Sequence, residues 1–444
     1  MTERADLLAK ASKPAEEALR LHAYYKGKMQ TMPKCAIRSL EDFSIWYTPG
    51  VAAPCKAIQA DPDLIYDYTN KANTIAVVSD GTRVLGLGDI GPGAGLPVME
   101  GKAMLFKYLG GVDAVPICLG TKDPDELIRT VRLLSPSFGA INLEDIAMPK
   151  CFRILRELQA TSQIPIWHDD QQGTGTVLLA AMINALTVVG KEMSRVRIAM
   201  IGMGAANVPT YRFLTASGAD PSCIIACDAG GILGPHRLEY ERDPAFAEQW
   251  KVCLESNPAG VRGGIEEALR GADVCVAFSA GGVIKPEWVK GMAPDAIVFA
   301  CANPIPEIWP WEAKEAGARI VATGRSDFPN QVNNSLGFPG IFRGTLDVRA
   351  RTITDEMCYA AADALASHIG DKLASNHILP TMDDWEIFPR EAAAVAMKAQ
   401  EQGVARLERS YDELYHNASN IIRRSRELTQ MMMHKGFIEE APED

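Results

Sequence analysis

Two pairs of adjacent carboxylates are the residues of this chain best suited to chemistry. Asp169 and Asp170 directly follow one short apolar run, and Glu144 and Asp145 follow another. If the four side chains converge, they cannot all remain ionised without a cation, because like charges a few Å apart repel strongly at a protein-like dielectric. A hard divalent ion such as Mg²⁺ or Mn²⁺, which takes oxygen ligands, would relieve that repulsion. The alternative is that both pairs are ordinary polar residues of surface turns.

The segments around these pairs predict elements that would place them at one edge of a sheet. The apolar runs that end at the acidic pairs are typical of buried strands. Residues 177–186 are almost wholly apolar and predict a buried helix whose first turn is capped by Thr174 or Thr176. A strand, an acidic pair and a helix in this order are typical of a site at the carboxyl edge of an α/β sheet.

The segment before the first acidic pair contains a lysine in an unusual place. Residues 73–79 and 82–87 alternate around an Asp-Gly pair, which predicts a β-hairpin. Residues 86–95 are too glycine-rich for a core element, so the backbone there is expected to approach another group closely. A helix is expected to open at Glu100, with Lys102 in its first turn, where a cation opposes the helix dipole. A solvated surface lysine is the alternative.

The stretch from about 195 to 325 predicts one doubly wound unit that binds a dinucleotide. Its first strand, over 196–201, leads into the loop Gly202, Gly204, Ala205 and Ala206 and then a helix. Asp228 ends the next strand, 24 residues after Gly204, where an acid typically binds the ribose. Further strand-like runs follow at 273–278, 296–302 and 319–323. The sixth loop position is Asn207 rather than Gly or Ala, which predicts looser packing of the helix on the strand.

Three other polar residues occupy predicted turns. Tyr47 stands before Thr-Pro-Gly, a forced turn that would fix its ring, and a packing role is the alternative. Asn303 follows a strand-like run and Asn334 lies at a turn, and local turn chemistry is the alternative to ligand binding for both. Helices are expected over residues 5–25, from Thr354 onward, and over about 404–433, the last as a packing or oligomer helix.

The composition excludes several classes of protein. The 444 residues are 47% hydrophobic and 23% charged, which is ordinary for a globular protein of two or three domains. The net charge of −11 argues against a nucleic-acid or anionic-membrane partner. Neither a signal peptide nor an uncharged apolar run of about 18 residues is found. Ten cysteines without a CxxC pair indicate reduced thiols and a cytoplasmic location.

Taken together, several segments resemble the malic enzyme family in its short bacterial form. They are YTPGVA, LGLGDIGPGAGLPVMEGKAMLFK, INLEDIAMPKCF, IPIWHDDQQGTGT, ATGRSDFPNQVNNSLGFPGIFRGTLDV and the Gly-x-Gly loop. The resemblance covers nearly the whole chain. It implies a divalent cation and NAD(P)⁺ as cofactors, and oxidative decarboxylation of L-malate to pyruvate and CO₂ as the reaction.

The resemblance also implies a role for each matching residue. Glu144, Asp145 and Asp170 are expected to bind the metal, with Asp169 beside them. Tyr47 resembles the general acid of the family and Lys102 the general base, and a base needs a lowered pKa, which a cation and a helix N-terminus would favour. The expected ligand-binding residues are Arg83, Asn303 and Asn334 for the substrate, and Gly202, Gly204, Ala205, Ala206, Asp228 and Asn303 for the dinucleotide.

The expected architecture is α/β. An N-terminal substrate and dimer domain (1–167) precedes a Rossmann-like domain (168–333), and a C-terminal helical segment (334–444) packs back on the first. NAD⁺ is expected over NADP⁺, because Asp228 would repel a 2′-phosphate and no Lys or Arg occurs before Arg237. A homodimer or higher oligomer is expected. Two other functions are open: a non-oxidative relative acting on oxaloacetate or converting malate to lactate, and a silent NAD-binding subunit.

Overall fold

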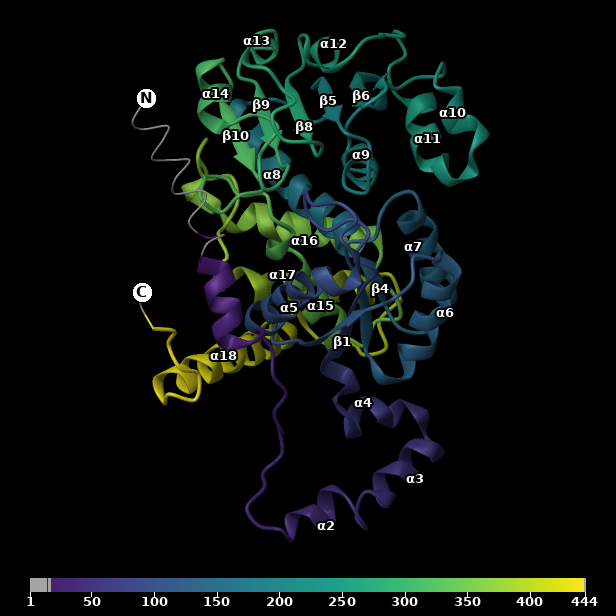
Figure 1. Ribbon diagram of the computed structural model, residues 1–444, viewed down its shortest axis with the longest axis vertical. Helices are drawn as coiled ribbons and strands as arrows, with labels where there is room; N and C mark the ends of the chain where they lie inside the picture. Colours follow the sequence, from purple (N-terminus) through teal and green to yellow (C-terminus); the bar gives the residue numbers. More distant parts are fainter. Residues whose placement is uncertain (1–13, 15–16, 443–444) are drawn as a thin grey trace.

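Two sheets of mostly parallel strands, each covered by helices, form the centre of the structure (Figure 1). The computed structural model describes residue 14 and residues 17–442. The first sheet has the order β2-β1-β3-β4, and its pairings are all parallel. Its strands are β1 (Thr74–Ser79), β2 (Asp113–Cys118), β3 (Ala140–Leu143) and β4 (Ile166–His168).

The second sheet has the order β10-β9-β8-β5-β6-β7 and is parallel except for the β6–β7 pairing. Its strands are β5 (Ile198–Ile201), β6 (Ile224–Asp228), β7 (Gly231–Ile232), β8 (Val274–Ala277), β9 (Ile297–Ala300) and β10 (Ile320–Thr323). The doubly wound unit predicted over 195–325 is thus confirmed.

Alternation along β1 explains how helices cover both faces of the first sheet. Ile75 and Val77 pack in a core with Phe106 and Phe342, whereas Val78 packs in a second core with side chains of the helices on the opposite face. The first core is formed by α5 (Gly91–Gly110), α15 (Phe338–Asp347), α17 (Ile387–Glu401) and α18 (Tyr411–His434), and the second includes α6 (Pro124–Leu134) and α7 (Lys150–Thr161).

The helix α8 (Thr174–Val189) lies between the two sheets and packs on α9 (Asn207–Ala216) and α16 (Asp355–His368). Among the described residues, the helical run Asp169–Val189 is long and apolar enough to cross a membrane by length and composition. However, 72% of its apolar window is buried inside the protein. This run is therefore the central core helix, as the sequence predicts for residues 177–186.

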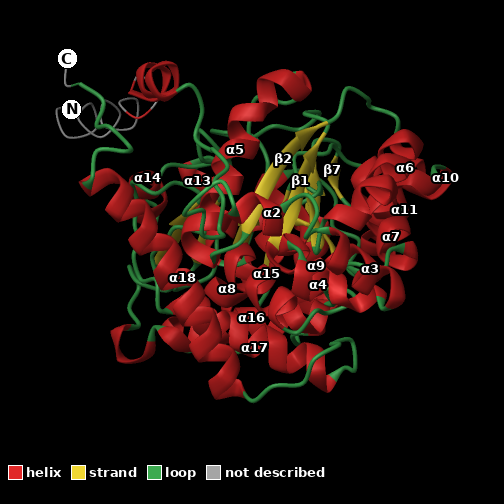
Figure 2. Ribbon diagram, turned by 90° about the horizontal axis from the view of Figure 1, so that it is seen from below, coloured by secondary structure: helices red, strands yellow, loops and turns green. Residues whose placement is uncertain are grey.

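The remaining helices flank the second sheet or precede the first. Those around the second sheet are α10 (Leu238–Arg242), α11 (Ala247–Glu255), α12 (Ile265–Leu269), α13 (Pro286–Val289) and α14 (Pro310–Glu315). Those before β1 are α2 (Asp42–Trp46), α3 (Ala52–Ala60) and α4 (Ile65–Tyr68). Both faces of the sheets are covered when the molecule is seen from below (Figure 2).

The predicted hairpin over 73–87 is wrong. Both edges of β1 are already paired, in parallel, with β2 and β3. The residues after β1 form a loop instead, because the buried Asp80 carboxylate accepts hydrogen bonds from Thr82 and Lys150 and holds the chain away from β1.

Two predicted helix starts are also wrong. α5 begins at Gly91 rather than Glu100, with Pro92 in its first turn, where the missing N–H of proline costs nothing. Lys102 therefore lies in the middle of a 20-residue helix. α8 follows directly from a π-helical turn, η4 (Asp169–Gly173), so neither threonine caps it in the described structure. The Thr176 hydroxyl instead donates to the Gln172 carbonyl.

The terminal helices follow the sequence less closely. The last helix begins at Tyr411, not near 404, because the Ser410 side chain caps it. Residues 17–25 of the predicted 5–25 helix are helical, and most of the earlier ones lie outside the described residues. All ten cysteines lie in the described part of the chain and are free thiols.

Candidate active site

Three carboxylates meet at the switch point of the first sheet. β1 is flanked there by β2 on one side and β3 on the other, and the crevice at the carboxyl ends of such strands is the usual ligand site of a doubly wound sheet. Glu144 and Asp145 directly follow β3, and Asp170 lies in the turn η4 that follows β4. One oxygen atom from each of the three lies within 4.8 Å of the others.

Local hydrogen bonds hold these carboxylates in place. The Asn142 amide donates to Glu144 Oε2 at 2.8 Å, and the Asp145 backbone N–H donates to Asp170 Oδ2 at 2.9 Å. Asp145 has a φ of 54°, an uncommon left-handed conformation for a residue other than glycine. Its Oδ2 atom is buried and has no hydrogen-bond partner among the described residues. A buried, unpartnered carboxylate oxygen beside two other carboxylates fits a hard cation.

The electrostatics of the cluster agree with that fit. Burial, together with the neighbouring acids, raises the pKa of Glu144 well above the ordinary glutamate value. Burial and the charge of Asp170 raise the pKa of Asp145 to about 8. Burial also raises the pKa values of Asp169 and Asp170. The residues therefore fit a divalent ion, since full ionisation of the cluster needs a compensating positive charge.

Lys102 projects from α5 into this cluster. Its Nζ atom lies 3.0 Å from Glu144 Oε1, forms an ion pair with Asp169, and sits over the Phe338 ring, 4.1 Å from the ring centroid. Burial alone lowers the pKa of Lys102, but the charges of Asp169 and Glu144 and their hydrogen bonds raise it above the ordinary lysine value. The protein's own groups thus hold Lys102 as an ammonium. The prediction that a helix N-terminus lowers its pKa is wrong, because Lys102 is not near one.

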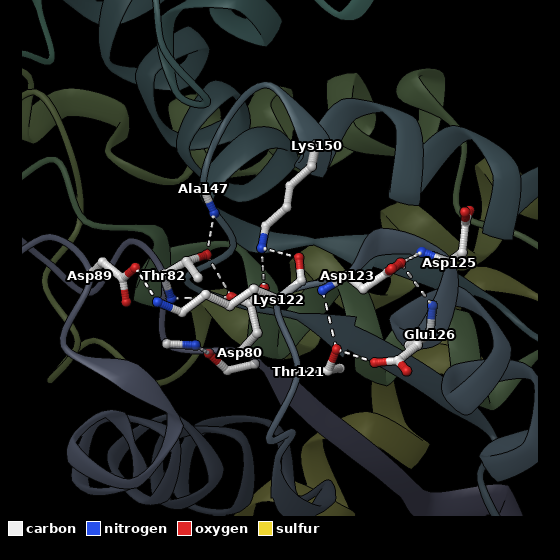
Figure 3. A network of polar contacts seen from close by, with 12 residues as sticks. Asp80, Thr82, Asp89, Thr121, Lys122, Asp123, Asp125, Glu126, Ala147 and Lys150 are labelled. Atoms are coloured by element: carbon white, nitrogen blue, oxygen red, sulfur yellow. Dashed lines mark hydrogen bonds and ion pairs between the residues drawn. The ribbon is translucent and has the colours of Figure 1, made fainter.

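A second polar network joins the loop after β1 to the loop after β3 (Figure 3). Lys150 Nζ lies 2.6 Å from Asp80 Oδ2 and also donates to the Lys122 carbonyl at 3.0 Å. The Thr82 hydroxyl donates to Asp80 Oδ1 at 2.6 Å and accepts from the Ala147 N–H at 2.9 Å. This network ties the loop after β1 to the loop after β3, and so fixes the position of both loops at the site.

The predicted substrate residues lie on three separate segments of the chain. The Arg83 backbone N–H donates to the Asp145 carbonyl at 3.0 Å, and the Arg83 charge lowers the pKa of Asp170, partly offsetting burial. Asn334 begins the short helix η7 (Asn334–Leu336), which packs against the turn η4. A Cβ atom on Gly86 would lie 2.1 Å from the Asn303 carbonyl oxygen. The close approach predicted for residues 86–95 therefore brings a loop of the second sheet to the first.

Tyr47 is the one predicted catalytic residue that the chain does not bring to the cluster. It directly follows α2 and is 71% exposed. α2 and α3 project below the first sheet (Figure 1) and lead through α4 to the amino end of β1, whereas the cluster follows the carboxyl ends of β3 and β4. In this chain taken alone, Tyr47 is therefore mainly in contact with solvent, and the packing role offered as the alternative is not seen.

The dinucleotide loop lies at the switch point of the second sheet, between β5 and β8. Gly202 has a φ of 87°, and a Cβ atom on it would lie 2.4 Å from the Phe278 carbonyl oxygen. Gly204, Ala205 and Ala206 lead into α9, whose first N–H groups receive no side-chain cap in the described structure and can bind phosphate. Asn207 donates to three backbone carbonyls of β5, β8 and the loop, so the predicted looser packing is replaced by a hydrogen-bonded bridge.

The end of β6 carries a feature that the sequence does not reveal. Arg237 donates from Nη1 to Asp228 Oδ1 at 2.9 Å and from Nη2 to Asp228 Oδ2 at 3.0 Å. The Tyr240 hydroxyl donates to the same carboxylate. A guanidinium group therefore lies directly at the residue expected to bind the ribose, although it is nine positions away in the chain.

Several contributing residues were not predicted from the sequence. Asn142 was hidden inside an apolar strand, although an amide two residues before an acid on the same strand face is a usable signal. Lys150 and Asp80 form their pair across 70 positions, and no local pattern predicts it. Phe338, stacked under Lys102, belongs to a segment that the resemblance already covers.

Comparison with known proteins gives consistent results. The family descriptions "Malic enzyme, N-terminal domain" and "Malic enzyme, NAD binding domain" match residues 26–159 and 315–401. The chain is 48% identical to the bifunctional malic/malolactic enzyme of Bacillus subtilis (strain 168), over 88% of this chain and 94% of the relative. It is 49% identical to the NAD-dependent malic enzyme of Geobacillus stearothermophilus, over 86% and 78%. Other relatives are named NADP-dependent malic enzymes. The crystal structure of Entamoeba histolytica malic enzyme superposes with a TM-score of 0.96 at 46% identity, over 99% of this chain and 92% of that one.

Proposed function

This chain belongs to the malic enzyme family, and we propose that it oxidises and decarboxylates L-malate to pyruvate and CO₂ with NAD⁺ and a divalent cation. The observation that carries the proposal is the convergence of Glu144, Asp145 and Asp170 around Lys102. The loop at Asn303, which follows β9 of the dinucleotide-binding sheet, touches the same region.

In this proposal Glu144, Asp145 and Asp170 hold Mg²⁺ or Mn²⁺. The cation supplies Lewis acidity toward the hydroxyl and carboxylate oxygens of the substrate. When Glu144 binds a cation, less negative charge remains beside Lys102 to keep it protonated. The neutral, basic form of Lys102 is then favoured. Lys102 then takes the proton of the malate C2 hydroxyl, with Asp169 holding its Nζ atom in place.

The other residues orient the substrate and complete the reaction. Arg83 binds a carboxylate of malate, since a guanidinium matches a carboxylate in geometry and charge. Asn303 and Asn334 hold the substrate from the second sheet and from η7. After CO₂ leaves, Tyr47 donates a proton to C3 of the enol. Because Tyr47 is remote from the cluster of its own chain, the tyrosine for this last step must be supplied from outside that chain.

We propose NAD⁺ as the preferred coenzyme, with Gly202, Gly204, Ala205 and Ala206 around the pyrophosphate. Asp228 ends β6, where a carboxylate accepts hydrogen bonds from the ribose hydroxyls and repels a 2′-phosphate. Arg237 neutralises much of that repulsion, so the preference for NAD⁺ over NADP⁺ should be modest.

A malolactic activity is a second candidate, because one relative is named a bifunctional malic/malolactic enzyme. The same residues serve a reaction that ends in lactate without net release of NADH. A silent NAD-binding subunit is disfavoured, since the buried acidic cluster costs stability and has no structural use of its own.

We further propose the domain division at residues 167 and 333, a homodimeric or larger assembly, and a cytoplasmic location. The free thiols support a reducing compartment. The packing of α15, α17 and α18 against α5 supports assignment of the C-terminal helices to the first unit.

Production of pyruvate from L-malate in the presence of Mn²⁺, together with NADH from NAD⁺ or NADPH from NADP⁺, tests the proposed reaction. Lactate without NADH would replace it with the malolactic activity, and neither product would refute both. Lys102→Ala should slow hydride transfer by roughly 10²- to 10⁴-fold. Tyr47→Phe should retain it and lose tritium exchange into the methyl group of pyruvate, with turnover lower by roughly 10²- to 10⁴-fold. Unchanged tritium exchange in Tyr47→Phe would remove Tyr47 from the acid role.

A further inference from the structure

The segment that carries Tyr47 forms a projecting arm, which we define as residues 29–60 with α2 and α3. Its start is anchored on α5, where the Lys28 N–H donates to Glu100 Oε2 at 3.1 Å and Lys28 Nζ donates to the Pro97 carbonyl at 2.8 Å. Within the arm, the Trp46 indole donates to the Ala36 carbonyl at 3.1 Å. The arm is therefore a defined structure that extends away from the body of the molecule (Figure 1).

The arm lies at the wrong end of the first sheet to serve its own site. It leads through α4 and η2 (Asn70–Asn73) into the amino end of β1, and Lys34 Nζ holds it there by a 2.8 Å hydrogen bond to Asn70. The carboxylate cluster follows the carboxyl ends of β3 and β4. The six residues of β1 span about 20 Å at roughly 3.3 Å per residue, far more than a side chain can bridge.

The arm also exposes more apolar surface than a free segment should. Seven large apolar or aromatic side chains on it are between 47% and 86% exposed: Met32, Ile37, Leu40, Phe43, Ile45, Trp46 and Tyr47. At roughly 200 Å² per large side chain, their exposed parts amount to about 800 Å², the area that each partner buries in a standard protein interface. Such a surface marks a contact with another protein.

We propose that the occupant of this surface is a second copy of the chain, and that Tyr47 of each copy completes the carboxylate and lysine site of the other. Each chain holds both a site without a tyrosine and an arm with one, so one two-fold contact satisfies both copies at once. A two-fold axis perpendicular to the long axis of the molecule inverts the partner. The arm that projects past the amino end of one sheet then meets the carboxyl edge of the other.

This inference rests on the proposed role of Tyr47, and a mixed dimer tests it. Tyr47→Phe and Lys102→Ala chains with different tags are co-expressed, and the heterodimer is purified through both tags. Each parent homodimer should be roughly 10²- to 10⁴-fold impaired. If Tyr47 acts in the partner's site, the heterodimer has one intact site of two and should show about half of the wild-type turnover. A heterodimer as inactive as its parents would place Tyr47 in its own chain's site and overturn the proposal.

Two further measurements do not depend on turnover. A photoreactive benzophenone side chain in place of Tyr47 should cross-link to the loops after β1 or β3 of a second chain. Cross-links within one chain, or none to these loops, would overturn the proposal. Leu40→Asp, on the arm, should yield monomers by light scattering at micromolar concentration. The control Leu133→Asp alters a leucine outside the arm that is also largely exposed, at 71% against 86% for Leu40, and should remain a dimer. Wild-type protein that is monomeric would refute the shared site, whereas a cross-linked dimer that fails to oxidise malate would refute only the proposed reaction.

Discussion

Replacing Asp145 with asparagine should flatten the pH dependence of stability of the protein in EDTA. Asp145 is buried at the centre of the cluster, and its Oδ2 atom has no hydrogen-bond partner among the described residues. Asparagine has nearly the same shape, and it tolerates the left-handed φ of 54° that this position requires. The substitution therefore removes a titrating group while leaving the backbone and the packing in place.

The size of the effect follows from the raised pKa. Burial and Asp170 raise the pKa of Asp145 to about 8, whereas an unfolded aspartate has a pKa of about 3.9. Between these values the folded protein keeps the proton and the unfolded chain releases it. The contribution of Asp145 to the free energy of unfolding is therefore fully present below about pH 4. It decreases by about 1.4 kcal/mol per pH unit as the pH rises toward 8. From pH 5 to pH 7, titration of Asp145 should therefore lower the free energy of unfolding of the wild type by about 3 kcal/mol, and the variant should not show this loss.

Urea unfolding followed by tryptophan fluorescence at pH 5, 6, 7 and 8 measures this difference. The matched control Asp371→Asn changes an exposed aspartate on a short turn and should follow the wild-type pH profile. Mn²⁺ should stabilise the wild type increasingly as the pH rises, since its ligands must release protons, and should stabilise the variant much less. Equal slopes for the variant and the wild type in EDTA would show that Asp145 is ionised there, and the repulsion argument would fail.

Three other changes test separate parts of the site. Arg237→Gln should raise the ratio of kcat/KM for NAD⁺ to that for NADP⁺ by about 10- to 100-fold, because it removes charge-assisted hydrogen bonds of about 1.5–3 kcal/mol. The control is Arg195→Gln, which changes an exposed arginine. An unchanged ratio in Arg237→Gln would exclude Arg237 from coenzyme selection. Asp80→Asn should lower the free energy of unfolding by about 3 kcal/mol, because it leaves the Lys150 ammonium without its buried partner. Urea unfolding measures this difference, and a decrease in the free energy of unfolding below about 1 kcal/mol would contradict the prediction. Gly86→Ala should lower kcat/KM for malate at least tenfold, because the Cβ atom of the new alanine would displace the Asn303 carbonyl. An unchanged kcat/KM would mean that the contact between residues 86 and 303 does not position the substrate.

Local chemistry explains why much of the second sheet could be predicted from the sequence. Each of its main strands is a short apolar run, buried on both faces, and the Gly-x-Gly loop marks the first turn. The hairpin prediction failed because local alternation around Asp80-Gly81 cannot reveal that β1 is already paired on both sides. The start of α5 was missed because four glycines and two prolines near it indicate a loop, whereas packing of Met99, Ala103 and Phe106 on the sheet maintains the helix.

The candidate site shows the same division between local and distant information. The acidic pairs could be found because each directly follows a strand, and parallel strands end at one edge. The charge state of Lys102 could not be predicted from the sequence, because it depends on Asp169 and Glu144, which lie 67 and 42 positions away in the chain. The same holds for Arg237 at Asp228, where the position of the guanidinium depends on how the chain folds back after β7.

The two sheets meet in a way that links coenzyme binding to the acid cluster. The helix α8 lies between the two sheets, and the loop after β9 contacts the loop after β1 through Asn303 and Gly86. In the proposed reaction, hydride transfer requires the C2 atom of malate and the coenzyme within contact distance of each other, so we expect the two crevices to form one site. A glycine at 86 permits the necessary approach, and the Asp80 and Lys150 network fixes the loop that carries it. The loop after β1 therefore carries Arg83, whose charge acts on Asp170, and contacts the dinucleotide-binding sheet through Gly86. In the proposed reaction, the same backbone would set the distance between the substrate and the dinucleotide.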